Sequence, residues 1–277
     1  MKNIIVLFLL FISHIAFASD EPPCHGAAGR YHPNGGGFVA STASVAVSAF
    51  VGMDASVCDY ASVFGNAAIA GHATITDRAE VSGDGQVSGY AKIAGNAKIS
   101  GRATVLGNAN IFGNVLVTDH ATVAGDAMIF EDALVLDSAL VRGQALVYAH
   151  ARIEGRASVI DASVTGHARI SGQSIIWGQA HIYGNALISG NANISGSASV
   201  YGNATILGSA LVYNNAKICS GEIRGLVVAD ICSSWQETNE SPLASAEVVD
   251  GARDNSSVFV DFNSSATQAS GTQAISR

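Results

Sequence analysis

Proline is almost missing from this chain, and its distribution is informative. The sequence has four prolines, and all of them lie outside residues 43–221: Pro22, Pro23, Pro33 and Pro242. Because proline has no backbone N–H, a long segment that avoids it is typical of a chain whose amides almost all donate to a β-ladder. A disordered segment rich in glycine, alanine and serine would not exclude proline so strictly. The absence therefore predicts ordered β-structure through this region.

Basic residues and long hydrophobic runs are scarce as well. There are 14 Lys and Arg residues against 22 Asp and Glu residues, which gives a formal net charge of −8. An acidic surface disfavours nucleic acid and anionic membranes as partners. The one pronounced apolar run, residues 4–12, is too short to span a bilayer. We therefore expect no membrane insertion.

The same apolar run has the features of a secretory signal peptide. Lys2 precedes it, and the small-residue segment Ala16-Phe17-Ala18 follows it. This succession of basic, apolar and small residues is typical of a cleaved export signal. We predict cleavage after Ala18 and a secreted or periplasmic protein.

In place of these features the chain has a six-residue repeat, roughly Ala-x-Val/Ile-x-Gly-Asn, between residues 43 and 221. One unit reads Ala-Ser-Val-Phe-Gly-Asn at residues 61–66. The apolar first and third positions alternate with mostly polar ones, which is the two-residue period of a strand with one buried face. Glycine at the fifth position supplies the backbone freedom for a corner. Strand and corner repeated every six residues predict an all-β fold, a parallel β-helix.

Residues 38–221 resemble the superfamily of hexapeptide-repeat, left-handed β-helix proteins that includes trimeric bacterial acyltransferases. The lead-in His-Pro-Asn-Gly-Gly-Gly-Phe-Val-Ala at residues 32–40 is similar to openings of secreted or uncharacterised members. The resemblance implies three hexads per coil, a triangular cross-section, left-handed winding and about ten coils. It is specific for the fold and much less so for function, because the repeat encodes coil geometry.

The repeat and its flanks predict five regions. They are a signal peptide (1–18), an N-terminal cap (19–42), the hexapeptide-repeat β-helix (43–221), a C-terminal cap (222–235) and a flexible polar tail (236–277). The tail is predicted because the periodicity disappears beyond Trp235 into Ser, Thr, Asn, Gln and Ala.

Four cysteines bracket the repeat. In an exported chain they indicate disulfides rather than a zinc site, and four cysteines allow three pairings. The pairing that closes short loops would fasten both ends of the β-helix. We predict Cys24–Cys58 and Cys219–Cys232.

With eighteen residues per coil, residues eighteen apart stack roughly 5 Å apart. One outward column is then mostly aromatic, and its step shortens to seventeen at Thr165 because residues 157–161 form a five-residue unit. Met128 and Leu146 lie beside this column. Trp177 is among other outward apolar residues of the middle coils. Because the rings point outward, we expect them to add little to the core. Contiguous exposed apolar surface usually marks an interface. We predict a homo-oligomer, which the resemblance implies is a trimer; contact with a glycan or envelope component, or a merely decorated surface, are the alternatives. The column consists of Phe112, Phe130, Tyr148, Tyr183 and Tyr201.

A neighbouring corner column places Asp132, His150 and His167 on successive coils. A carboxylate and two imidazoles at this spacing could bind a divalent metal, or one histidine could act as a general base. The resemblance adds that hexapeptide acyltransferases use a corner histidine at a subunit boundary. Solvated corners, however, ordinarily contain such polar residues. His150 and His167 are thus candidate catalytic residues, and the three side chains are a candidate metal site.

The export signal, the flanking cysteines and the uninterrupted repeat together favour a non-enzymatic structural or binding protein with no cofactor. The alternative is a hexapeptide-repeat acyltransferase. Against it, acyl donors are intracellular, and enzymes of the family usually interrupt the helix with an extruded loop. A more remote alternative is a zinc protein like the γ-type carbonic anhydrases, but the closely spaced histidine pair of that family is missing.

Overall fold

The computed structural model describes residues 22–227 and Cys232. The predicted signal peptide and polar tail lie outside the described residues, as do residues 228–231 and 233–235 of the predicted C-terminal cap. Within the described part, a short 3₁₀ helix, η1 (Pro23–Gly26), is followed by strands that are mostly two residues long, one for each hexad.

The strands form three sheets, because each strand from β2 onward pairs with the strand three places later in the chain. Sheet I has twelve strands. They are β1 (Gly29–Tyr31), β2 (Phe38–Ala40), β5 (Ser56–Val57), β8 (Thr74–Ile75), β11 (Lys92–Ile93), β14 (Asn110–Ile111), β17 (Met128–Ile129), β20 (Leu146–Val147), β23 (Ser163–Val164), β26 (His181–Ile182), β29 (Ser199–Val200) and β32 (Lys217–Ile218).

Sheets II and III have eleven strands each. Sheet II comprises β4 (Phe50–Val51), β7 (Ala68–Ile69), β10 (Gln86–Val87), β13 (Thr104–Val105), β16 (Thr122–Val123), β19 (Leu140–Arg142), β22 (Ser158–Ile160), β25 (Ile175–Trp177), β28 (Asn193–Ile194), β31 (Leu211–Val212) and β34 (Leu226–Val227). Sheet III comprises β3 (Ser44–Val45), β6 (Ser62–Val63), β9 (Glu80–Val81), β12 (Lys98–Ile99), β15 (Leu116–Val117), β18 (Leu134–Val135), β21 (Arg152–Ile153), β24 (Arg169–Ile170), β27 (Leu187–Ile188), β30 (Thr205–Ile206) and β33 (Glu222–Ile223).

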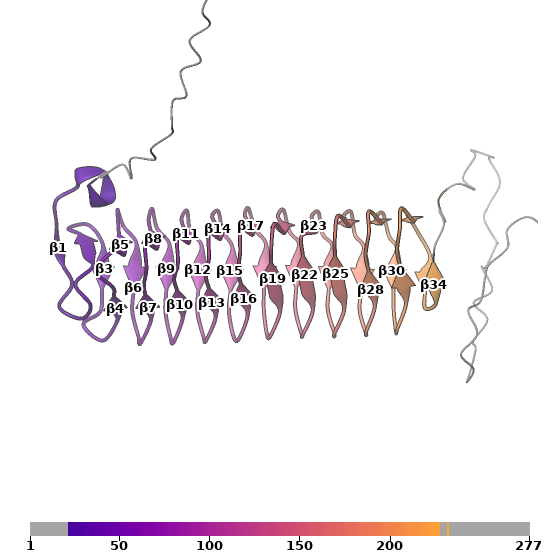
Figure 1. Ribbon diagram of the computed structural model, residues 1–277, viewed down its shortest axis with the longest axis horizontal. Coiled ribbons are helices and arrows are strands. Elements are labelled where there is room, and N and C mark those ends of the chain that lie inside the picture. The colour runs from indigo at the N-terminus through magenta and orange to yellow at the C-terminus, as the bar shows by residue number, and fades with distance from the viewer. Residues whose placement is uncertain (1–21, 228–231, 233–277) are drawn as a thin grey trace, which may run out of the picture.

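The chain winds into a parallel β-solenoid of about eleven coils, close to the ten expected, and the three sheets are its faces. The coils stack into a straight rod with η1 and β1 at one end and β34 at the other (Figure 1). The predicted all-β parallel fold is therefore confirmed, while its left-handed winding stays a prediction of the resemblance.

The strand register follows the predicted eighteen-residue coil. Asn110 pairs with Lys92 on one side and Met128 on the other. The predicted irregularity is present too, since Leu146 pairs with Ser163, seventeen residues on. Residues eighteen apart, or seventeen apart at this coil, therefore lie in columns along the rod, and the spacing shortens again only at the last coil.

The core consists of the first and third hexad positions, as the period predicts. In the coil of β14, Ala109 and Ile111 are both completely buried. Ser174 occupies an alanine position and is also fully buried, and its hydroxyl donates to the Ser171 carbonyl at 2.9 Å. A polar residue is tolerated there because its hydrogen bond is made inside the coil.

Most corners require a left-handed backbone at the fifth hexad position. Gly107 has φ +80°, and a Cβ built on it would lie 2.8 Å from the Gly125 carbonyl oxygen of the next coil. At other corners aspartate takes this place: the carboxylates of Asp77 and Asp137 accept hydrogen bonds at 2.8 Å from the amides of Gly95 and Gly155. Aspartate tolerates this conformation, and here its side chain also ties one coil to the next.

A glycine-rich loop closes the N-terminal end. β1 pairs antiparallel with β2, and β2 already pairs parallel with β5, so coil pairing begins before the predicted boundary at residue 43. The loop between β1 and β2 lies against β4: the Val51 amide donates to the Asn34 carbonyl at 3.0 Å, and the Gly37 amide donates to the Val51 carbonyl at 2.8 Å. A Cβ on Gly37 would lie 2.2 Å from the Gly52 carbonyl oxygen, so only glycine fits.

The C-terminal end extends beyond the expected boundary at residue 221. β33 and β34 pair parallel with β30 and β31 although the spacing between strands shortens there. The coil therefore continues through residues that were assigned to the cap, because a shorter corner still lets the strand reach its partner.

Two disulfides fasten the two ends. Cys24 is bonded to Cys58 and Cys219 to Cys232, with Cα–Cα distances of 5.3 and 5.7 Å. These are the two pairings expected from the sequence. Such bonds are typical of oxidising, non-cytoplasmic compartments. In the described part of the chain, no helix is long and apolar enough to cross a membrane.

Candidate functional site

The predicted aromatic column forms a ladder of stacked rings on one edge of the rod, directly after the strands of sheet I. We call Phe112, Phe130, Tyr148, Tyr183 and Tyr201 the aromatic strip. The Phe112 and Phe130 ring centroids are 5.0 Å apart, those of Phe130 and Tyr148 are 4.8 Å apart, and those of Tyr183 and Tyr201 are 4.8 Å apart. Thr165 separates the two groups. The ring planes differ by at most 6° within these pairs.

The stacking follows from the coil spacing. Neighbouring strands lie roughly 4.8 Å apart, which is also a favourable distance between aromatic centroids. The strip residues are half-buried except Tyr183, which is 39% exposed. Because the faces of the rings contact each other, the outer surface of the strip consists largely of ring edges. The rings lie outside the buried core, as expected, but they also pack coil against coil.

Burial also affects one of the strip hydroxyls. It raises the pKa of Tyr183 above its ordinary value, and the neighbouring Tyr201 adds to the rise. The neutral phenol is thereby favoured in the folded protein. Tyr183 therefore presents an uncharged phenol at physiological pH.

One cysteine of each disulfide lies in the same column as the aromatic strip. This relation was not anticipated from the sequence. Counting back from Phe112 by whole coils leads to Cys58, and counting on from Tyr201 leads to Cys219. Each cysteine joins this column to one end of the rod, through η1 or through Cys232. The column is thus bounded at both ends by covalent bonds.

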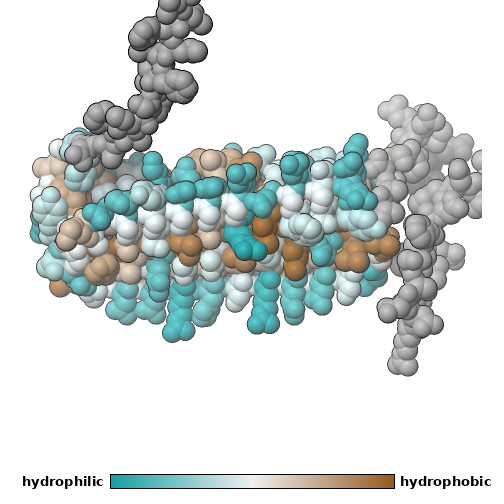
Figure 2. Space-filling view, viewed as in Figure 1, coloured by the Kyte–Doolittle hydropathy of each residue, from teal (hydrophilic) through white to brown (hydrophobic). Residues whose placement is uncertain are grey.

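Two aliphatic side chains extend the strip across sheet I. Met128 is 38% exposed and Leu146 is half-buried, and they pair as neighbours on β17 and β20. The hydrophobic surface is otherwise divided: Figure 2 shows separate groups of hydrophobic residues along the rod, with hydrophilic residues between and beside them.

The predicted corner group forms a second ladder, two residues beyond the aromatic strip. The imidazole rings of His150 and His167 are stacked with centroids 4.7 Å apart and an interplanar angle of 12°. His150 Nδ1 lies 3.6 Å from the Asp132 carboxylate, which accepts a hydrogen bond from the Asn114 amide at 2.9 Å. The ladder continues as amide pairs, Asn96 with Asn114 and Asn185 with Asn203, at 3.0 and 3.1 Å.

This geometry does not make the predicted metal site. Ring nitrogens coordinate a metal in the plane of the imidazole, and two parallel rings one above the other direct these nitrogens side by side rather than at one point. Residues 22–227 and Cys232 contain no group of three His, Cys, Asp or Glu side chains that could hold a metal ion. Asp132, His150 and His167 are thus brought together as a ladder of coil-to-coil contacts. A catalytic role for either histidine stays a prediction.

A buried carboxylate on sheet III was not anticipated from the sequence. Glu154 follows β21 and is 8% exposed, and it pairs with both Arg152 and Arg169. The two arginines are partners in the register of β21 and β24. Two guanidinium groups around one carboxylate compensate its burial, so we assign this triad to the stability of the corner.

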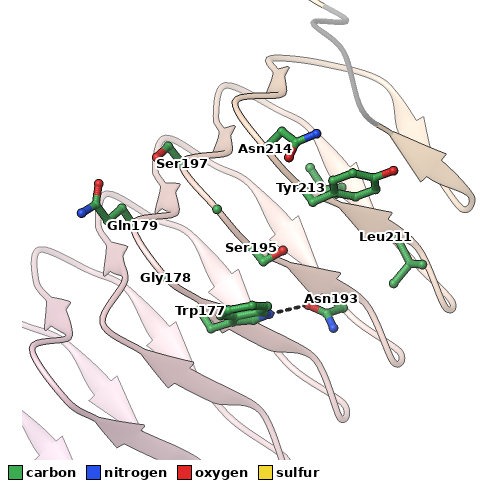
Figure 3. A pocket seen from close by; sticks show the side chains of 11 residues that line it. Trp177, Gly178, Gln179, Asn193, Ser195, Ser197, Leu211, Tyr213 and Asn214 are labelled. Carbon is green, nitrogen blue, oxygen red and sulfur yellow. Dashed lines mark hydrogen bonds between the residues drawn. The ribbon is translucent and has the colours of Figure 1, made fainter.

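An open hollow of about 580 Å³ lies at the corner after sheet II, near the C-terminal end. Trp177 and Tyr213 are two coils apart in one column, and Ser195 occupies the coil between them (Figure 3). The Trp177 Nε1–H donates to the Asn193 Oδ1 at 2.9 Å. Trp177 and Leu211 are 47% and 45% exposed. From the sequence, Trp177 is expected among the outward apolar residues, but the hollow is not. The signal for it is a small residue, Ser195, between Trp177 and Tyr213 in one column.

Fold and surface together define a β-solenoid protein that is built on hexapeptide repeats and presents ladders of like residues along its edges. A family model described as YdcK Beta solenoid repeat matches residues 198–214, which span β29, β30 and β31. This match and the coil geometry fit the hexapeptide-repeat β-helix family. No curated protein matches the chain.

Proposed function

We propose that this protein is an exported, non-enzymatic rod that associates with further copies of itself through the aromatic strip and the adjoining part of sheet I. The trimer implied by the resemblance is the assembly we expect. Disulfides at both ends of the coil support a location outside the reducing cytoplasm.

The observation that carries the proposal is the continuity of the strip over three successive coils. Phe112, Phe130 and Tyr148 are stacked, and Met128 and Leu146 lie beside them on the same face. Hydrophobic side chains that adjoin over several coils offer a partner a flat, repetitive surface. Such contiguous surface is more often an interface than a random feature.

The energetics are adequate for association although each ring contributes modestly. Full burial of such a side chain stabilises by about 1.5–3 kcal/mol, but these rings are already half-buried against each other. Burial of the remaining half against a partner would contribute about 1 kcal/mol for each ring. The five rings of each copy, together with the aliphatic pair, can offset the rotational and translational cost of association.

The test introduces charge beside the strip without removing a stacked ring. We expect wild-type protein to sediment as an oligomer at tens of micromolar. The double substitution Met128→Glu with Leu146→Glu should weaken the association at least about 100-fold, because two carboxylates would be desolvated in the contact. Circular dichroism should be unchanged.

The matched control places the same two charges on another face. Leu116 and Leu134 are half-buried and pair as neighbours on β15 and β18 of sheet III, as Met128 and Leu146 do on sheet I. Leu116→Glu with Leu134→Glu should therefore leave sedimentation unaltered. A strictly monomeric wild-type protein, or equal effects of the two double variants, would contradict the proposed interface.

A further inference from the structure

The hollow at the corner after sheet II leaves room for one aromatic or sugar ring between Trp177 and Tyr213. On this protein, aromatic side chains on adjacent coils stack with centroids 4.7–5.0 Å apart. Trp177 and Tyr213 are separated by two coils, roughly 9–10 Å. Their side chains extend in the same direction from the rod, and the small Ser195 lies between them (Figure 3). A ring inserted over Ser195 would be about 4.8 Å from each aromatic side chain, which is within stacking range.

The polar groups around this gap suit a ligand rich in hydroxyls. Asn193 accepts the indole N–H of Trp177, which orients the indole and leaves the NH₂ group of Asn193 to donate. Ser195 supplies a hydroxyl between the two aromatic side chains and Asn214 supplies an amide next to Tyr213, while Gln179 and Ser197 lie on the other side of the corner (Figure 3). None of the eleven lining residues is Asp, Glu, Lys, Arg or His. The hollow therefore offers hydrogen bonds but no formal charge.

We propose that this hollow binds a neutral carbohydrate, with one pyranose ring inserted between Trp177 and Tyr213 above Ser195. Aromatic side chains contact the C–H groups of a sugar, and the amides and hydroxyls reach its O–H groups. Because the hollow is open to solvent, the neighbouring sugars of a chain can extend out of it. This inference does not depend on the proposed self-association, which uses a different corner.

The experiment uses mature protein that carries Trp235→Phe, so that Trp177 is the single tryptophan. Maltohexaose, cellohexaose and N-acetylchitohexaose are the neutral probes, with adenosine as a ligand whose planar ring is a purine. We expect at least one of the hexasaccharides to change the Trp177 fluorescence saturably. By calorimetry, Tyr213→Ala should weaken that binding at least about tenfold, because one stacking partner is lost.

A second variant fills the gap instead of removing its walls. Ser195→Phe should stack between Trp177 and Tyr213 as the strip residues do, preserve the fold and abolish sugar binding. Ser189→Phe is the matched control, since Ser189 has the equivalent position after β27 on another corner; it should bind as wild type does. Absence of binding to all three hexasaccharides, binding of adenosine alone, or unchanged sugar binding in Ser195→Phe would overturn the proposal.

Discussion

At the scale of single residues, the corner glycines are under the strongest constraint. Gly107 combines a left-handed backbone with the close approach of the Gly125 backbone. Gly208, at φ +63°, has no atom of the described residues within 4 Å of a built Cβ. The two glycines occupy the same place in the hexad. They therefore separate two effects that usually act together, backbone strain and steric overlap with the next coil.

We expect Gly208→Ala to lower the free energy of unfolding by about 1 kcal/mol, through strain alone. Gly107→Ala should lower it by about 2–3 kcal/mol, because a backbone segment of the next coil must also shift. Urea denaturation followed by circular dichroism measures both values. Equal losses would show that the overlap is relieved at no cost.

At the scale of the element, each strand is too short to be stable and depends on its neighbours above and below. The aromatic strip adds side-chain contacts to these ladders. Phe130 contacts rings on both sides, while Phe112 contacts one. The number of stacked neighbours, rather than the residue type, should then set the contribution of each ring.

Phe130→Ser should accordingly destabilise the dissociated protein by about 2–3 kcal/mol and Phe112→Ser by about 1–1.5 kcal/mol. The comparison is made in the Met128→Glu, Leu146→Glu background, so that loss of association does not contribute. If the two serine variants have the same urea midpoint, the contribution of each ring does not depend on how many neighbours it stacks against.

The limits of sequence reasoning also appear at this scale. The alternation of Ala109 and Ile111 with polar neighbours was sufficient to predict the strand, its buried face and the coil, because burial alone decides them. Column membership followed from the period, so Asp132, His150 and His167 were correctly placed together. Ring orientation did not follow, since it depends on side-chain torsions, and parallel imidazoles replaced the converging ligands that were hypothesised. The hollow at Ser195 was missed because it is defined by a small residue between large ones.

At the scale of the whole molecule, the rod is quasi-one-dimensional, because each coil contacts only the coils next to it. Unfolding is therefore expected to begin at the terminal coils and to proceed inward. The Cys24–Cys58 bond spans 34 residues and the Cys219–Cys232 bond spans 13 residues. Both hold an end that would otherwise fray first.

Loss of the Cys24–Cys58 bond through paired Cys→Ser substitutions should cost about 4 kcal/mol, and loss of the Cys219–Cys232 bond should cost about 3 kcal/mol, if chain entropy dominates. Hydrogen exchange should accelerate in the coils next to the missing bond and stay slow around β14 and β17. Acceleration along the entire rod would indicate a single cooperative unit instead.

The N-terminal loop has a consequence for how the molecule avoids becoming a fibre. A solenoid resembles a cross-β fibril in which one chain supplies every layer, and an open terminal layer would template the addition of other chains. Here the Val51 amide and carbonyl, which would face the next layer, are bonded to Asn34 and Gly37 of the same chain. The terminal strand of sheet II is thus already paired within the chain, and these two groups are not open to a further strand at that end.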